Sequence, residues 1–313
     1  MTDAVRNKLL LRLNKWRVEA RSDMSFRQLT TLGCGGTIKL TLFPDSVAKL
    51  VKVIKLLNKL QVAHCVLGKG SNVLAADEAY CGVVVCTTKL TGVRTKGNTV
   101  YALAGTSTVA VAKILQQKGL TGGEFLACLP ATVGGAVVGN AGCFGQDMKG
   151  AISSVTVLHN GRVKRITASG CKFAKRNSLF KRACGYTVLS VKMKFVQSTS
   201  QAVAAKIAEM RSTKAATQPL NYRSAGCALY HERVAVSRLI DLAGLKGLRV
   251  GDAQVSNKHA GFVLNIDKAT SKDIYLLIQH VRRELWQRFG VQARLEVVLI
   301  NFTNEQDDIF TKR

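Results

Sequence analysis

The sequence LPATVGGAVVGNAGCFG, residues 129–145, is the most informative stretch of the chain. Five of its 17 residues are Gly and three are Ala, so little side-chain bulk covers its backbone. Main-chain N–H groups in such a stretch can approach a flat or anionic ligand closely. A Gly-rich turn between two strands is the simpler interpretation of any one Gly pair. The density of this run, with apolar segments on both sides, favours a ligand cradle.

Length and composition limit the class of protein. The chain has 313 residues, 47% of them hydrophobic and 21% charged, which is enough for two or three globular domains. No run approaches the ~20 apolar residues of a membrane span. Residues 1–23 are typical of an amphipathic helix and lack the apolar core of a secretory signal. The nine Cys are scattered without a C-x-x-C pair, which indicates free thiols in a reducing cytoplasm.

The net charge of +27 raises the possibility of a nucleic-acid-binding protein, since Lys and Arg neutralise phosphates. The charge is spread along the whole chain, however, and aromatic residues make up only 6%, too few for a base-stacking platform. A positive field also favours small anionic ligands. We therefore expect small-molecule partners, and neither nucleic acid nor a membrane.

Hydrophobic periodicity predicts two α+β units before and around the Gly-rich stretch and a third α+β domain after it. Val109, Ala112 and Leu115 are expected on the buried side of the helix that ends at Gly119. The predicted elements are a helix at 1–23, a strand at 37–43, a helix opened by residues 44–46, a buried strand at 63–67, strands at 83–86 and 100–103, a helix ending at Gly119, β-rich segments within 151–196, helices at 201–214 and 236–243, a long helix opened by the capping box at 270–273, and a closing strand at 295–301.

A second Gly-rich segment, Gly68-Lys69-Gly70-Ser71-Asn72, follows the predicted strand at 63–67. A P-loop is excluded because Lys69 sits between two glycines and no Ser or Thr follows it directly. A Rossmann fingerprint is excluded because Val73 stands where the third Gly is required. The segment can still form an anion-binding nest, but it does not belong to the common nucleotide folds.

Eight segments, in this order, resemble the UDP-N-acetylenolpyruvoylglucosamine reductases (UDP-N-acetylmuramate dehydrogenases), and together they cover about residues 25–300. Gly-rich turns are common, so one segment alone is weak, whereas eight in register are specific. The segments are Thr30-Thr31 with Gly35-Gly36, GKGSNVL at 68–74, LPATVGGAVVGNAG at 129–142, FAKRNSLFK at 173–181, YRSAGC at 222–227, LIDLAGLKG at 239–247, QVSNKHAGFVLN at 254–265 and FGVQARLEV at 289–297.

The resemblance implies an α+β chain with an FAD-binding fold of the vanillyl-alcohol-oxidase type, made of two α+β subdomains, and a C-terminal α+β substrate domain. The expected boundaries are 1–90, 91–198 and 199–304, with a tail at 305–313. The implied protein is a cytoplasmic monomer that uses non-covalent FAD, with NADPH as co-substrate, in peptidoglycan precursor synthesis. The short segment between Arg176 and Tyr186 resembles the subtype without an extra substrate-covering loop.

The resemblance also implies where ligands bind. The two Gly-rich stretches would hold the FAD, and weaker candidates for substrate contacts lie in the last domain. No metal site is expected. The FAD candidates are Gly68, Lys69, Gly70, Ser71, Asn72, Pro130, Thr132, Gly134, Gly135, Asn140 and Gly142, and the substrate candidates are Lys246, Gln254 and His259.

The family reaction reduces an enolpyruvyl double bond by hydride transfer from reduced flavin, so it needs a cation near the substrate carboxylate, a carboxyl group and a proton donor. Arg176 matches the family's catalytic Arg, and Glu296, in an apolar strand, matches the catalytic Glu. Cys227 stands where most members have the Ser that donates the proton. A thiol, with a reference pKa of ~8.5, is a stronger acid than an alcohol. We therefore hypothesise that Cys227 is the proton donor.

Three departures from the family pattern bear on substrate contacts. Lys175 replaces the usual Tyr, LYHE at 229–232 replaces F-K-N-P, and Arg294-Leu295 replaces a Glu-Pro pair. An alternative function is another FAD-dependent oxidoreductase of the same fold, acting on a different sugar or alcohol.

Overall fold

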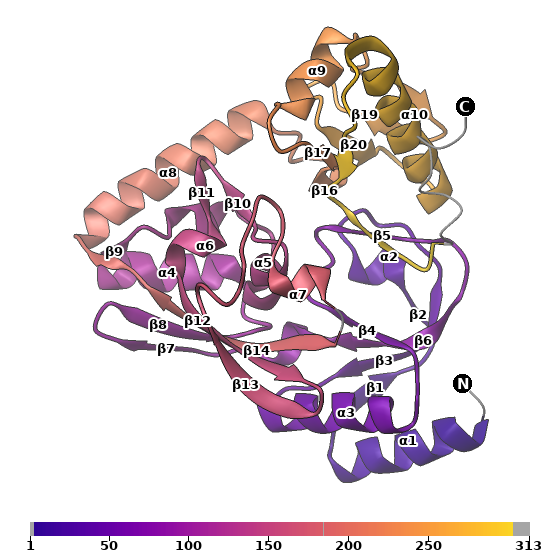
Figure 1. The fold of residues 1–313 in the computed structure, drawn as a ribbon, viewed down its shortest axis with the longest axis vertical. Helices are drawn as coiled ribbons and strands as arrows, with labels where there is room; N and C mark the ends of the chain where they lie inside the picture. The colour runs from indigo at the N-terminus through magenta and orange to yellow at the C-terminus, as the bar shows by residue number, and fades with distance from the viewer. Residues whose placement is uncertain (1–2, 184, 303–313) are drawn as a thin grey trace. The chain divides into compact units, whose positions relative to one another are not determined.

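A computed structural model of the chain describes residues 3–183 and 185–302, so Cys184 and the predicted tail at 305–313 lie outside the described residues. The architecture is mixed α+β, as predicted, and divides into two compact units (Figure 1). The three-domain division at 1–90, 91–198 and 199–304 remains a prediction. Unit 1 comprises Met1–Ser22, Leu40–Lys69 and Cys81–Lys214, and unit 2 comprises Asp23–Lys39, Gly70–Tyr80 and Ala215–Arg313.

The first part of unit 1 contains the predicted β-α-β arrangement, with strand order β1-β3-β6-β4 and β4 parallel to β6. Helix α3 begins where the sequence predicts, because the Ser46 hydroxyl accepts a hydrogen bond from the Lys49 N–H. Leu50, Ile54 and Leu57 lie on its buried side. The elements are α1 (Asp3–Lys15), β1 (Glu19–Arg21), β3 (Thr37–Phe43), α3 (Val47–Lys59), β4 (His64–Leu67) and β6 (Tyr80–Cys86).

Two predictions in this part are wrong. The N-terminal helix ends at Lys15 instead of residue 23, because Arg17 turns the chain in the left-handed region (φ 52°) and residues 19–21 then pair with β3. Strand β4 is not a buried strand, since it lies at the edge of its sheet and Val66 is 40% exposed.

The second part of unit 1 is a five-stranded sheet of order β13-β12-β14-β8-β7. Its strands carry buried apolar residues toward the core, and α5 contacts both β14 and β8. Helix α4 ends at Gly119 in the left-handed conformation, as predicted. The elements are β7 (Val93–Lys96), β8 (Thr99–Leu103), α4 (Thr108–Lys118), β9 (Leu120–Thr121), α5 (Val133–Val138), β10 (Gly142–Cys143), β11 (Gln146–Asp147), α6 (Met148–Ala151), β12 (Ile152–His159), β13 (Arg162–Thr167), α7 (Leu179–Arg182), β14 (Tyr186–Lys194), β15 (Val196–Gln197) and α8 (Ser200–Thr217).

One face prediction in α4 is wrong. Val109 is 37% exposed, whereas Val111, Ala112 and Leu115 are buried. The helix therefore turns Val111, rather than Val109, toward the core, and this choice depends on packing against the rest of unit 1.

Unit 2 is built around a four-stranded sheet, β16-β20-β19-β18, and the long helix α10. Thr270 and Asp273 form the predicted capping box at the start of α10, and Gly290 ends the helix. The elements are β2 (Met24–Ser25), α2 (Phe26–Leu29), β5 (Val73–Ala75), β16 (Arg223–Cys227), β17 (Leu229–Tyr230), α9 (Val236–Leu242), β18 (Arg249–Val250), β19 (Ala253–Val255), β20 (Phe262–Asn265), α10 (Ser271–Phe289), β21 (Arg294–Leu295) and β22 (Val298–Ile300).

The predicted closing strand at 295–301 is wrong, because two short strands stand in its place. Strand β21 pairs with β17, whereas β22 pairs with β5 in parallel. Glu296 and Val297 connect the two strands. Glu296 therefore lies in a connection between two pairings and not inside a continuous strand.

Within residues 3–183 and 185–302, every helix is too short or too polar to cross a membrane.

Candidate active site

The two Gly-rich stretches predicted to hold a cofactor meet in unit 1. A Cβ placed on Gly68 would lie 2.3 Å from the Thr132 hydroxyl oxygen, so only glycine allows this approach. The Lys69 ammonium lies 3.2 Å from the Ser107 hydroxyl, and Ser107 forms a backbone bridge with Thr132. The structure thus brings residues 68 and 69 against the start of the 129–145 stretch.

The loop at 68–72 offers unpaired backbone donors. Among the described residues, no hydrogen bond is donated by the N–H groups of residues 69–72. Gly70 adopts the left-handed conformation (φ 59°), and its carbonyl oxygen accepts a hydrogen bond from the Thr31 N–H. Successive N–H groups in a turn of this kind are typical of an anion-binding nest.

The 129–145 stretch is neither a turn nor a source of free donors at its first helical turn. It forms the short helix α5, in which the N–H groups of Val133 and Gly134 donate to the carbonyl oxygens of Thr106 and Ala104. Gly134 packs against Ala104, but Gly135 is exposed. Gly135 is therefore the one exposed glycine of α5 within its first helical turn.

These features fit the flavin dinucleotide that the resemblance implies. The loop supplies anion donors and a Lys side chain, and Gly135 supplies a surface without a side chain. The buried amide oxygen of Gln146 has no partner among the described residues, so it is open to a ligand donor. Pro130 is exposed, and Gly142 is buried where a Cβ would lie 2.1 Å from the Gln146 carbonyl oxygen.

Arg176 lies at a tight turn that is attached to α5. The backbones of Ala174 and Asn177 exchange two hydrogen bonds, and Arg176 between them adopts the left-handed conformation (φ 55°). The buried Asn140 side chain donates to the Ala174 carbonyl oxygen at 3.0 Å. The Ser178 hydroxyl donates to the Val138 carbonyl oxygen at 2.7 Å. Asn140 therefore positions the Arg176 turn, and its side-chain bonds lie within the protein.

Cys227, Glu296 and Asn72 come together in unit 2. The Glu296 N–H donates to the carbonyl oxygen of Ala228, the residue after Cys227, at 2.9 Å. The Asn72 side chain donates to the Glu296 carbonyl oxygen at 3.0 Å, and the Val298 N–H donates to the Asn72 carbonyl oxygen. Three of the segments that carry predicted site residues are therefore joined by backbone contacts.

His259 lies next to the Cys227 thiol, across Gly261. A Cβ on Gly261 would lie 3.1 Å from the Cys227 sulfur and 3.2 Å from the His259 ring. The Gly261 N–H donates to His259 Nδ1, so the proton of the neutral ring is on Nε2. Burial lowers the pKa of His259, and the charge of Lys246 adds to this effect against an opposing backbone hydrogen bond. The imidazole beside the thiol is therefore held neutral.

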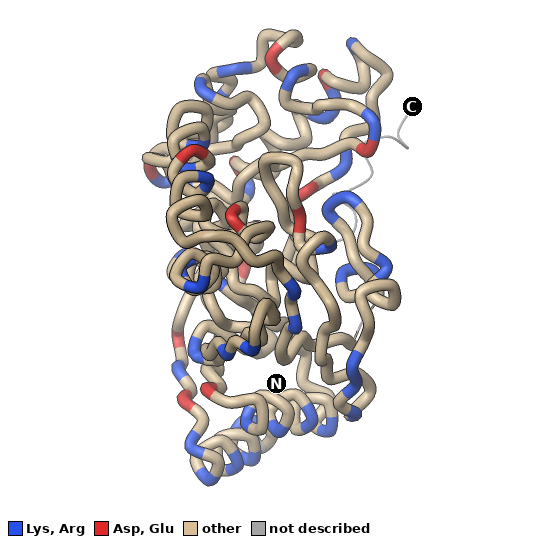
Figure 2. Tube along the Cα trace, turned by 90° about the vertical axis from the view of Figure 1, so that its left-hand side faces the viewer, with Lys and Arg blue, Asp and Glu red and all other residues tan. Residues whose placement is uncertain are grey.

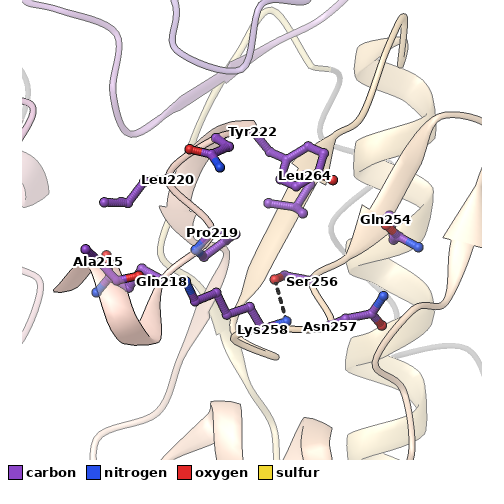
Figure 3. A pocket seen from close by; sticks show the side chains of 11 residues that line it. Ala215, Gln218, Pro219, Leu220, Tyr222, Gln254, Ser256, Asn257, Lys258 and Leu264 are labelled. Atoms are coloured by element: carbon purple, nitrogen blue, oxygen red, sulfur yellow. Dashed lines mark hydrogen bonds between the residues drawn. The ribbon is translucent and has the colours of Figure 1, made fainter. Parts of the chain in front are cut away.

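The remaining substrate candidates are separate from this pair. The Lys246 ammonium forms an ion pair with Asp241 at 2.8 Å. Gln254 lies on β19 and lines a cavity of about 290 Å³ in unit 2. Lys258 extends along this cavity to the Ala215 carbonyl oxygen, 2.6 Å away (Figure 3). The amides and hydroxyls around it suit a polar, planar ligand.

Most residues of this cavity are not among the substrate-binding residues that the sequence predicts. The Lys258 N–H donates to the Ser256 hydroxyl, and both residues belong to the 254–265 segment, where only Gln254 and His259 had been selected (Figure 3). The density of amide and hydroxyl side chains at 218–224 was the available signal. The missed lining residues include Gln218, Asn221, Tyr222, Ser256, Asn257 and Lys258.

Two departures from the family pattern contact each other. Leu229 is paired with Leu295, and Tyr230 with Arg294, in the β17-β21 ladder. The Arg294 guanidinium lies 3.1 Å from a Glu232 carboxylate oxygen. The unusual residues before Glu296 and after Cys227 therefore form one local structure.

Among the described residues, no group of three or more His, Cys, Asp or Glu side chains is placed to bind a metal ion. The described cysteines are thiols outside any disulfide.

Comparisons with known proteins agree with the expected family. The FAD binding domain family matches residues 38–167, and the C-terminal domain of UDP-N-acetylenolpyruvoylglucosamine reductase matches residues 218–300. A UDP-N-acetylenolpyruvoylglucosamine reductase of Clostridium novyi is 34% identical over 92% of this chain and 94% of its own length. One of Carboxydothermus hydrogenoformans is 34% identical over 87% of this chain and 91% of its own length.

A solved structure gives the same result. The UDP-N-acetylenolpyruvylglucosamine reductase of Thermus caldophilus superimposes with a TM-score of 0.77 at 31% identity, covering 91% of this chain and 99% of that protein. The similarity in sequence and in structure extends over nearly the whole length of these relatives. The chain therefore belongs to the UDP-N-acetylenolpyruvoylglucosamine reductase family.

Proposed function

We propose that this chain is the NADPH-dependent flavoenzyme that reduces the enolpyruvyl group of UDP-N-acetylglucosamine-enolpyruvate to give UDP-N-acetylmuramate in peptidoglycan precursor synthesis. The observation that carries the proposal is the backbone hydrogen bond between Glu296 and Ala228, which joins the segments of Glu296 and Cys227 in unit 2, both within the family's C-terminal domain. An oxidase of the same fold has no need for a proton donor beside a carboxyl group.

The cofactor site proposed here consists of the 68–72 loop and the 129–145 stretch. The N–H groups of residues 69–72 and the Lys69 ammonium would bind the pyrophosphate, and Gly135 would lie against the flavin ring. FAD held there would supply the hydride-transfer chemistry between NADPH and the substrate double bond. Gly68 and Gly134 serve a different purpose, since their missing side chains allow protein segments to pack together.

We assign the substrate chemistry to three side chains. Arg176 binds the substrate carboxylate through its planar guanidinium, and the hydrogen bonds of Asn140 and Ser178 hold its turn in place. Cys227 donates the proton to the carbon next to the carboxylate. Glu296, as a neutral carboxyl group, donates a hydrogen bond to the enolate-like oxygen that develops before this proton arrives.

We infer that the cavity lined by Gln254 binds part of the UDP-sugar. Amide and hydroxyl side chains provide both donors and acceptors, as a pyrimidine and a ribose require. Lys258 adds a positive charge for a phosphate. The assignment of Lys246 is weaker because Asp241 already pairs with it.

We also infer a cytoplasmic monomer. Both substrates are small soluble molecules, and the thiols described here suit a reducing compartment. Gel filtration of the flavin-loaded protein tests the monomer.

An anaerobic titration tests the function. NADPH should bleach the flavin absorbance, and the enolpyruvyl UDP-sugar should restore it without oxygen. NADPH should bleach the flavin of Cys227→Ala at the normal rate, but the substrate should recolour it about 10²- to 10⁴-fold more slowly. This is the usual rate contribution of a general acid. Cys227→Ser, which keeps a hydroxyl donor, is the matched control and should recover part of the rate. Normal recolouring by Cys227→Ala rules out the thiol as donor, and failure of the substrate to recolour the wild type rules out the reaction.

A further inference from the structure

The expectation that the positive charge is spread along the whole chain is wrong, because the charge is concentrated in one unit. Unit 1 carries 30 Lys and Arg against 6 Asp and Glu, whereas unit 2 carries 16 against 13. Figure 2 shows this excess as many more blue than red positions along the trace. The net charge is therefore +24 in unit 1 and +3 in unit 2. A uniformly basic composition does not explain such a difference between two parts of one chain.

The five-stranded sheet of unit 1 holds a dense part of this charge. Its strands β7, β8, β12, β13 and β14 contain no Asp or Glu at all. Opposite charges usually face each other across surface strands, because such pairs stabilise a sheet and like charges weaken it. The absence of acids here keeps the cations available to an external anion.

Strand register places five of the cations on one face. Residues directly opposite each other share a face, as do residues two apart in one strand. Lys192 on β14 faces Tyr101 on β8, which faces Arg94 on β7. Two residues further along the same strands, Lys194 faces Thr99, which faces Lys96. At the far edge of the sheet, Arg165 on β13 faces Thr156 on β12. We call this set the basic sheet face; its cations are Arg94, Lys96, Arg165, Lys192 and Lys194.

The basic sheet face is mostly exposed and poor in stacking surface. Arg94, Lys96, Arg165 and Lys194 are exposed, and the positions between them are Ser, Thr, Leu103 and Tyr101. The Arg94 guanidinium lies 5.2 Å from the centre of the Tyr101 ring, and the Lys192 ammonium lies 5.8 Å from it. The one aromatic ring of this face is therefore occupied by cations and offers no free platform for a nucleotide base.

We propose that the basic sheet face docks this protein reversibly on a bilayer that contains anionic phospholipids. The five strands span about 19 Å from β13 to β7, at roughly 4.8 Å between strands. A bilayer surface extends over this whole width, whereas a nucleic-acid strand without stacking contacts only the cations along its path. A peripheral contact of this kind needs no spanning helix, and it is independent of the reductase proposal.

Co-sedimentation of the full-length, flavin-loaded protein with vesicles tests the proposal. The protein should bind vesicles of phosphatidylcholine and phosphatidylglycerol in equal amounts, and it should not bind phosphatidylcholine alone. Each cation at an anionic surface contributes about 1 kcal/mol. The triple variant Arg94→Gln, Lys192→Gln, Lys194→Gln should therefore bind roughly 100-fold more weakly, since 1.4 kcal/mol is a factor of ten.

The matched control removes the same charge elsewhere in unit 1. Lys52→Gln, Lys55→Gln, Lys59→Gln changes three exposed residues of α3 and should leave most of the binding intact. Both triple variants should keep the flavin absorbance and turnover of the wild type, which shows that they are folded. Equal loss in the two variants, or equal binding to neutral vesicles, overturns the docking face. Binding to a single-stranded oligoribonucleotide but not to anionic vesicles overturns the membrane and assigns the face to nucleic acid.

Discussion

Gly135→Ala is the sharpest test of the cofactor site, because the flavin-free protein tolerates the added methyl group. Gly135 has no left-handed φ, and its Cβ would lie 3.3 Å from the Thr132 hydroxyl oxygen, with no other atom within 4 Å. That contact is tight by a few tenths of an ångström. Against this cost, Ala is favoured over Gly inside a helix by about 1 kcal/mol. The two effects nearly cancel, so the free energy of unfolding without FAD should change by less than about 1 kcal/mol.

With FAD present the same methyl group should interfere. If the flavin ring lies against α5 at Gly135, the methyl group must displace it, and overpacking of this kind costs about 1–3 kcal/mol. Since 1.4 kcal/mol is a factor of ten, the dissociation constant for FAD should rise roughly 5- to 150-fold. Titration of the flavin-free protein with FAD, followed by flavin fluorescence, measures this constant. Urea unfolding without FAD measures stability.

Gly150→Ala is the matched control. Gly150 lies in α6, where a Cβ meets no atom within 4 Å. This variant should bind FAD as the wild type does. Gly134→Ala is the opposite control, since its Cβ would lie 3.0 Å from the Ala104 backbone oxygen and should destabilise the protein even without FAD. Wild-type FAD binding by Gly135→Ala would refute the placement of the flavin on α5, and a large loss of stability without FAD would refute the reasoning about space.

Three further outcomes are expected. Arg294→Ala should lower the free energy of unfolding by at most about 1 kcal/mol, because the side chains of Arg294 and Glu232 are 67% and 66% exposed; an increase in substrate KM above tenfold would show that the pair contacts substrate after all. The lowered pKa of His259 means that the unfolded chain binds more protons below about pH 6.5. Stability should therefore decrease as the pH falls through that value, and in urea unfolding His259→Asn should lose less stability than the wild type over this range; equal losses contradict the assignment. Asn140→Ala removes side-chain bonds to Asp147 and to the turn that carries Arg176, so kcat should fall more than FAD affinity; an unchanged kcat would mean that the turn does not need this support.

Local signals predicted the helices well because the determinants of a helix end lie within a few residues. The capping box of α10 and the Gly119 end of α4 are of this kind, and both are confirmed. The failures depend on contacts far along the chain. Residues 19–21 leave the helical pattern because they pair with β3, and Glu296 leaves the strand pattern because its N–H bonds to Ala228. Neither partner can be inferred from the periodicity of one segment.

The site was predicted less evenly than the fold. The resemblance selected Cys227 and Glu296, and the structure brings their segments together through the Ala228–Glu296 hydrogen bond. It also selected Asn140, whose side chain is hydrogen-bonded within the protein. Composition alone cannot separate a Gly or Asn that contacts a ligand from one that allows two protein segments to meet. Gly68 packs against Thr132, whereas Gly135 is exposed, although both lie in predicted cofactor motifs.

The contact between the two departures from the family pattern explains how Glu296 keeps its place. In the family a Pro precedes the Glu, and Pro cannot donate to a strand ladder. Here Leu295 takes that position and pairs with Leu229, and the ladder leads directly to the hydrogen bond between Glu296 and Ala228. The residues that depart from the family pattern on the two strands are therefore paired with each other. Because the ladder joins the segments that carry Cys227 and Glu296, it can fix their approach while the residues around them differ from the family pattern.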